Sequence, residues 1–395
     1  MTAVATLPLD RTDPLDPPPA YRALAAQERV FQVRTPRGDL AWVVSRLEDV
    51  RQALTDRALS SDPRTPGFPT YLTGDVPPPP GFFMQADPPD HTRLRRLVTR
   101  EFLVSNMEAL RPRIEENLRR IVADLGPVDS ADLVSQVALP LAASTICELL
   151  GVPFEDYPLF VRLTDTVLSR TSTPEQAMGA AVELLGYFDR LVTAKKQHPT
   201  DDVFSRLVAR EEAGDATHEE LVGVATLLLL GGYDTMAQMI GLGVYALLRH
   251  PDELARLRGD SSLAPGAVEE LLRYLTVNHS GLPRGVLEDT EIGGQPIRAG
   301  EGVIVMLNAA NRDQDAFTDP DALDLTRGSR DHVAFGHGFH KCIGLTLARI
   351  ELQVVFMTLF DLLPGLRCEV PEGDLPFRHD MVLYGLRSLP VGWDR

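Results

Sequence analysis

The longest apolar stretch of the chain covers residues 221–248, which carry a single charged side chain, Asp234. A stretch of this length could span a membrane as a helix. A charge at its centre would cost about 2.5–3.5 kcal/mol on insertion scales, and five glycines interrupt the stretch. Residues 217–220, Thr-His-Glu-Glu, also have the pattern of a capping box at a helix start. We therefore predict a long helix through the core of a soluble protein, with a membrane transporter as the alternative.

The remaining pattern predicts a mainly α chain with small β elements. Alternating apolar and polar residues indicate strands, and apolar residues three and four apart indicate helices. No internal repeat or long linker interrupts the chain, so we expect a single domain over residues 1–395. The expected segments, in order, are a proline-rich arm (1–20), a hairpin (30–45, turning at 37–39), a proline-rich loop (62–89), a mainly helical region (92–257), short strands (284–308, turning at 293–294), a loop-rich stretch (309–342) and a helix (343–362).

Composition narrows the class of protein. The net charge of −17 argues against broad nucleic-acid binding. Three cysteines are too few for a disulfide framework and suit a reducing cytoplasm. The first 19 residues lack the basic and apolar regions of a secretory signal. We expect a soluble cytoplasmic protein whose 395 residues can enclose a bulky planar cofactor in their core.

The strongest chemical signal is residues 335–344, with the sequence FGHGFHKCIG. Three glycines within nine residues let the backbone approach a flat partner closely. Cys342 lies where a helix is expected to begin, so the helix dipole and free amides favour its thiolate. His340 and Lys341 add positive potential beside it. Such a thiolate is a good ligand for a soft or borderline metal.

Zinc is the rival metal for this loop, since His337, His340 and Cys342 could all be ligands. A structural zinc site needs four ligands at recognisable pair spacings, and the chain has no second cysteine pair. The other cysteines, Cys147 and Cys368, are expected to be structural. A haem iron fits the glycine-rich loop better than zinc does.

The cysteine loop resembles the haem-binding loop of the cytochrome P450 family at each of its usual fixed positions. The resemblance covers the chain from about Tyr21 to its C-terminus and implies a triangular, mainly helical prism around a buried haem b. It implies that Cys342 is the axial ligand of the iron and that Phe335 and Gly336 contact the haem. Electron donation from a thiolate ligand favours O–O cleavage. The matching positions are Phe335, Gly336, Gly338, His340, Cys342 and Gly344, followed by residues 347–349.

Further basic residues are candidates for holding the haem. His91 and Arg95 lie four residues apart, hence on one helical face, which alone could be a solvated basic helix. The resemblance implies that this pair binds the haem propionates, together with Arg284 and His340. Two carboxylates buried beside a haem need cationic partners.

Glu270 and Arg273 lie three apart on a predicted helix, a spacing that is common in surface ion pairs. The resemblance implies instead a buried pair that meets Arg327 from the loop before the cysteine. We interpret this trio as structural, holding the cysteine loop in place.

The polar pair Asp234 and Thr235 interrupts the long apolar helix directly after two glycines. Such a pair could simply bond to the preceding turn. The resemblance implies a groove over the iron where oxygen binds. We predict that both residues deliver protons during oxygen activation, with the Thr235 hydroxyl facing the iron and Asp234 linking the site to solvent.

The implied reaction is insertion of one oxygen atom from O2 into an organic small molecule, in secondary metabolism. The sequence contains no flavin or nicotinamide fingerprint, so electrons are expected from a separate ferredoxin and reductase. We predict a monomer whose acidic electron donor docks near four basic residues in an otherwise acidic chain: Arg93, Arg96, Arg100 and Lys341.

Other readings of the sequence stay open. An enzyme of the same fold could use peroxide, or catalyse coupling or desaturation, and a non-enzymatic haem sensor is a further class. Residues 278–280, Asn-His-Ser, follow the predicted Glu270 helix and could contact a polar, oxygenated substrate. A solvent-facing turn is the alternative for these three residues.

Overall fold

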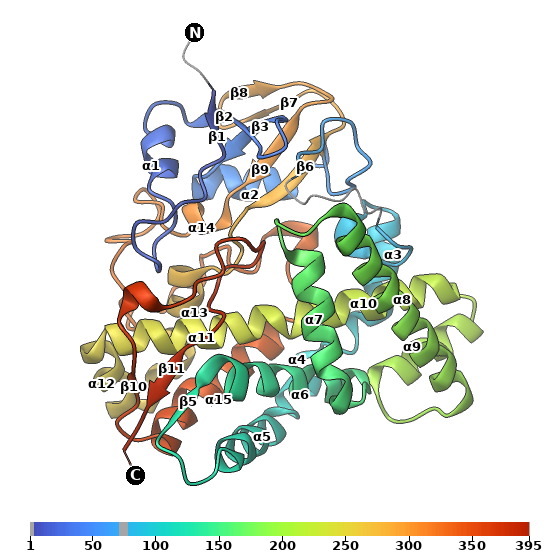
Figure 1. Ribbon diagram of the computed structural model, residues 1–395. Helices are drawn as coiled ribbons and strands as arrows, with labels where there is room; N and C mark the ends of the chain where they lie inside the picture. Colours follow the sequence, from blue (N-terminus) through green and yellow to red (C-terminus); the bar gives the residue numbers. More distant parts are fainter. Residues whose placement is uncertain (1–3, 71–77, 395) are drawn as a thin grey trace.

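The computed structural model describes residues 4–70 and 78–394 (Figure 1). Helices predominate over strands in the described chain, and a smaller β-rich part lies at one side of them (Figure 1). The mainly α class with small sheets is confirmed. The helices are α1 (Ala20–Ala25), α2 (Leu47–Thr55), α3 (Asp90–Thr99), α4 (Val104–Glu108), α5 (Arg111–Asp124), α6 (Leu139–Leu150), α7 (Tyr157–Leu168), α8 (Pro174–Gln197), α9 (Val203–Glu212), α10 (His218–Gly232), α11 (Asp234–Arg249), α12 (Pro251–Gly259), α13 (Ala264–Leu275), α14 (Leu307–Ala310) and α15 (Leu345–Leu362).

The main sheet has six strands in the order β1-β2-β3-β9-β6-β4. The predicted hairpin is confirmed as β2 and β3, with Gly38 at its turn in the left-handed region (φ 99°). The predicted short strands are confirmed as β6 to β9, with the turn at residues 293–294. The strands of this sheet and of the smaller sheets are β1 (Ala5–Thr6), β2 (Val30–Arg34), β3 (Leu40–Val44), β4 (Leu59–Ser60), β5 (Ser130–Asp132), β6 (Leu282–Val286), β7 (Thr290–Ile292), β8 (Gln295–Ile297), β9 (Gly302–Val305), β10 (Arg367–Cys368) and β11 (Pro390–Gly392).

The predicted long apolar helix crosses the middle of the molecule as α10 and α11 (Figure 1). The capping box is confirmed, since Thr217 and Glu220 exchange both hydrogen bonds. The helix is not regular throughout, because Tyr233 separates its two halves. The Thr235 hydroxyl donates to the Gly231 carbonyl (2.7 Å), an acceptor that a regular helix would give to a backbone amide. The stretch is long and apolar enough to cross a membrane, but 78% of its most apolar window is buried, as in the core helix of a soluble protein.

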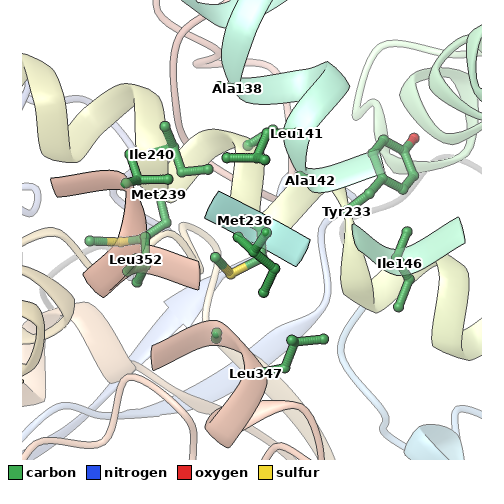
Figure 2. Packing of buried hydrophobic residues seen from close by; sticks show 14 of the residues in the cluster. Ala138, Leu141, Ala142, Ile146, Tyr233, Met236, Met239, Ile240, Leu347 and Leu352 are labelled. Carbon is green, nitrogen blue, oxygen red and sulfur yellow. The ribbon is translucent and has the colours of Figure 1, made fainter. Parts of the chain in front are cut away.

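The largest hydrophobic cluster joins α11 to α6 and α15. Figure 2 shows Met236 of α11 near Leu141 of α6, with Leu347 at the start of α15 opposite it. Fully burying a side chain of this size stabilises the fold by about 1.5–3 kcal/mol. Helix α15 confirms the predicted helix, but it begins at Leu345, two residues later than expected.

Part of the predicted proline-rich loop, residues 71–77, lies outside the described residues. The segment that follows packs closely against α10. A Cβ on Gly223 would lie 1.8 Å from the carbonyl oxygen of Pro80, so only glycine admits this approach.

Candidate functional site

The cysteine loop is a tight backbone structure that ends just before α15. Gly336 and Gly338 adopt φ values of 69° and 70°, which glycine tolerates and other residues rarely adopt. The Cys342 amide donates to the Phe335 carbonyl (2.9 Å), which closes the loop. A Cβ on Gly338 would lie 2.6 Å from the carbonyl oxygen of Leu54 on α2, so this position is also closely packed.

The side chain of Cys342 is accessible, although the protein surrounding it raises the pKa of its thiol through burial. The exposure of Cys342 and the raised pKa of its thiol are compatible if the sulfur faces a hollow enclosed by the protein. The Gly344 amide, Arg95 and Arg349 favour the thiolate, but burial outweighs them. The Gly344 amide thus acts in the direction that the sequence predicted, but in the protein alone its effect is smaller than that of burial. A bound metal ion would supply the missing positive charge and deprotonate the thiol.

A second accessible face lies on the α10–α11 junction. Gly231 is exposed and its two neighbours are half-buried, whereas residues 221–229 of the same helix are all buried. Nothing lies within 4 Å of the position that a Cβ on Gly231 would take. Thr235, one turn later, is half-buried. Figure 2 places Leu347, at the start of α15, opposite Met236 of α11. Gly231 and Cys342 are both exposed and lie five residues before these two labelled positions. From this exposure and placement we infer that the two residues face one central hollow.

The four basic residues predicted to hold the haem are brought together. The rings of His91 and His340 lie 4.1 Å apart between centroids, and Arg95 donates to the Lys341 carbonyl (2.5 Å). Burial and then Arg95 lower the pKa of His91 to about 4. Burial and then Arg284 lower the pKa of His340 to about 3. Arg95 and Arg284 stay charged beside these two histidines, so the group favours an anionic ligand, which would offset the charge of the arginines.

Within the described part of the chain, both ring nitrogens of buried His91 lack a hydrogen-bond partner. A buried polar atom without a partner is costly, so a missing acceptor or donor belongs beside it. The carboxylates of a haem would meet this need. The residues present therefore fit a haem whose propionates lie at His91 and whose iron lies at Cys342.

Asp234 does not share its contacts with Thr235. Its carboxylate pairs with Arg378 in the core, at 2.6 Å from Nη1 to Oδ1, and accepts from Gln238 (3.1 Å). Arg378 also reaches Asp165 of α7 (2.9 Å), whose side chain is 45% exposed. The sequence analysis missed Arg378, because no local pattern connects residues that are 144 positions apart.

The predicted trio of Glu270, Arg273 and Arg327 is present. Arg273 makes two 2.8 Å bonds to Glu270, and both side chains are almost completely buried. Arg327 reaches the same carboxylate at 3.1 Å. The pair is therefore a buried anchor for the 318–327 loop and not a surface ion pair.

Two further expectations are corrected by the structure. His279 and Ser280 are fully buried, and His279 lies 3.3 Å from the guanidinium of Arg11 in the N-terminal arm. They are packed inside the protein, neither in a solvent-facing turn nor open to the hollow, while Asn278 is half-buried. Arg93 leaves the predicted basic patch, because it forms an ion pair with Glu220 of α10.

The remaining basic patch consists of Arg96, Arg100 and Lys341, all of which are exposed.

The zinc alternative has no support, since no cluster of three His, Cys, Asp or Glu side chains that could hold a metal occurs among the described residues. A single thiolate with a planar cofactor needs no such cluster.

Comparison with known proteins agrees with this geometry. The family model described as Cytochrome P450 matches residues 188–374. The chain is 44% identical to Cytochrome P450-SU2 of Streptomyces griseolus, over 98% of this chain and 97% of that one. It is 40% identical to the vitamin D3 dihydroxylase of the same organism, over 99% and 98% of the two chains. The structure matches that of CYP105P1 in complex with filipin I with a TM-score of 0.92 at 38% identity, covering 99% of each chain. The chain belongs to the cytochrome P450 family of haem-dependent monooxygenases, among bacterial relatives of the CYP105 group.

Proposed function

We propose that this enzyme inserts one oxygen atom from O2 into an organic small molecule of secondary metabolism, with Cys342 as the axial ligand of its haem iron. We further propose that it works in the cytoplasm as a single-domain monomer that receives electrons from a ferredoxin. The exposed position of Cys342 at the end of its closed glycine loop is the observation that carries the proposal. When bound, the haem supplies the activation of O2, which thiolate donation favours.

The basic residues orient the cofactor in this proposal. His91, Arg95, Arg284 and His340 would bind the propionates, while Phe335 and Gly336 would lie against the ring. His91 supports the assignment best, because its unpartnered ring nitrogens provide a concrete need for a ligand. Charge-assisted bonds of this type are about twice as strong as neutral ones.

Thr235 and Asp234 would move protons on the opposite wall. The Thr235 hydroxyl donates to the Gly231 carbonyl, and its oxygen can also accept a hydrogen bond from a water in the hollow. Asp234 lies in the core, but Arg378 links it to the partly exposed Asp165. To relay a proton from solvent, the Asp234 carboxylate must exchange Arg378 for water.

The Thr235→Ala variant tests this role by comparing reductant consumed, hydrogen peroxide released and product formed. We expect electrons to flow and peroxide to be released, with product per reductant greatly reduced, since positioned proton transfer contributes about 10²–10⁴-fold. Thr226→Ala is the matched control, because Thr226 on α10 makes the same bond to the carbonyl four residues earlier (2.8 Å). Product per reductant equal to the wild-type value in Thr235→Ala would refute the proton-delivery role.

The ferredoxin would dock at Arg96, Arg100 and Lys341. Exposed charges steer an acidic partner over roughly the Debye length, so its reduction rate should fall as salt rises. Arg96→Ala should weaken that salt dependence, and Arg298→Ala, an exposed residue of the β-rich part, should not. Reduction by a ferredoxin that does not change with salt would contradict the docking site.

A further inference from the structure

Glu269 is a buried carboxylate directly before the Glu270 anchor, yet it holds a different part of the molecule. It lies on α13, is 2% exposed, and binds His332 and Arg349. The exposed Arg330 approaches the same carboxylate only to 3.7 Å. Both close partners flank the cysteine loop in the sequence, one before it and one after it. Glu269 therefore ties α13 to both ends of this loop.

The first connection runs through His332. Its Nδ1 accepts the Ala334 amide (3.2 Å), so its proton lies on Nε2 and is donated to Glu269 (3.0 Å). The side chain of His332 is 1% exposed, so water does not compete for these bonds. The carboxylate thereby fixes the backbone where the loop begins.

The second connection runs through Arg349 on α15. Its guanidinium binds Glu269 with two bonds, of 2.6 and 2.9 Å, in the bidentate geometry that fixes direction as well as distance. The same guanidinium lies 4.8 Å from the ring centroid of Phe335. The carbonyl of Phe335 accepts the amide of Cys342. Glu269 thus acts on the peptide that closes the loop around the sulfur.

Charge gives this arrangement a second effect. Arg349 is one of the cations that favour the thiolate form of Cys342. The His332 and Arg349 bonds hold the pKa of Glu269 at about 2 despite its burial, which acts in the opposite direction. The carboxylate is therefore charged at neutral pH and balances Arg349 close to the sulfur.

We propose that Glu269 is a positioning residue that sets the reduction potential of the haem, by fixing the Phe335 peptide and by balancing the charge of Arg349 near the Cys342 sulfur. The proposal rests on the proposed ligation of iron by Cys342. It differs from the role of Glu270, whose bonds reach Arg273 and the 318–327 loop and touch no residue of the cysteine loop.

The experiment is a spectroelectrochemical titration of the haem-loaded protein, compared between wild type and variants. Glu269→Gln keeps the shape and removes the negative charge, so Arg349 is left unbalanced and the reduced iron is favoured. A unit charge acting over roughly 10 Å at an effective dielectric constant of about 20 changes an equilibrium by about tenfold. We expect the ferrous-to-ferric ratio at a fixed potential to rise about tenfold, which is about 59 mV for a one-electron couple.

Arg349→Gln should shift the potential in the opposite direction, because it leaves Glu269 unbalanced instead. A purely structural role would not produce shifts of opposite sign. Glu269→Asp, which keeps the charge, should restore most of the wild-type potential. Arg330→Ala is the matched control, since it removes the distant, exposed partner of the same carboxylate. It should leave the potential unchanged.

The carbon monoxide complex of the reduced protein separates failure of this proposal from failure of the ligation. A wild-type protein without the far-red-shifted Soret band of a thiolate-bound haem would overturn the ligation by Cys342. A wild-type protein with that band, together with unchanged potentials in both glutamine variants or shifts of the same sign, would overturn only the role of Glu269. If Glu269→Gln fails to bind haem, Arg349→Gln still decides by the sign of its shift.

Discussion

Removing Arg378 should destabilise the protein more than removing the charge of its partner Asp234. Arg378→Met leaves a carboxylate that is 3% exposed in the core, with Gln238 as its remaining side-chain donor. Breaking a buried ion pair in this way costs about 3–5 kcal/mol. Asp234→Asn keeps the shape and leaves Arg378 bound to Asp165 at 2.9 Å. We expect Asp234→Asn to lower the free energy of unfolding by about 1–3 kcal/mol, the cost of weakening a buried hydrogen bond.

The double variant Arg378→Met/Asp234→Asn gives the sharper test. It removes both charges, so it should be more stable than Arg378→Met alone by about 2 kcal/mol, a strongly non-additive result. Urea unfolding at equal haem occupancy measures all three free energies. Arg387→Met is the control, because its pair with Asp380 is partly exposed to solvent and should contribute no more than about 1 kcal/mol. Equal costs for the two single variants with an additive double variant would refute this account of the core pair.

Two other predictions concern Glu351 on α15 and Gly338 in the cysteine loop. Burial raises the pKa of Glu351 on α15 to about 8, so the folded protein keeps a proton that the unfolded chain releases above about 4.5. Stability from this group is therefore present below pH 4.5 and falls by up to about 1.4 kcal/mol per pH unit towards pH 8. Glu351→Gln should make the urea midpoint depend less on pH between pH 5 and pH 8, and Glu148→Gln, at an exposed position of α6, should leave that dependence unchanged. An unchanged pH dependence in Glu351→Gln would contradict the assignment. Gly338→Ala forces a Cβ to within 2.6 Å of the Leu54 carbonyl at a φ of 70°, so haem content measured after purification should fall severely. It should stay normal in Gly373→Ala, where space is open, and full haem content in Gly338→Ala would show that the loop tolerates a side chain.

Local patterns carried most of what the sequence predicted correctly. The capping box at Thr217, the hairpin around Gly38 and the glycines beside Cys342 each depend on residues within about ten positions of one another. Backbone conformation and helix capping act at this range, so the chain displays them directly. The resemblance extended this range, since it predicted that His91, Arg284 and His340 lie together, as the structure shows.

The remaining features arise from contacts between distant segments. Arg378 reaches Asp234 across 144 positions, and Glu269 reaches Arg349 across 80. His279 appeared suited to a ligand but is covered by Arg11 from the N-terminal arm, 268 positions away. Polar residues in the sequence show that a partner is needed, but only the packed structure shows which partner meets the need.

The most direct test of the central claim is the carbon monoxide difference spectrum of the reduced, haem-loaded protein and its cysteine variants. Wild type and Cys368→Ser, the control for a cysteine away from the loop, should both show the far-red-shifted Soret band of a thiolate-bound haem. Cys342→His should lose that band even where it retains haem. The same band at full strength in Cys342→His would contradict the assignment of Cys342 as the iron ligand.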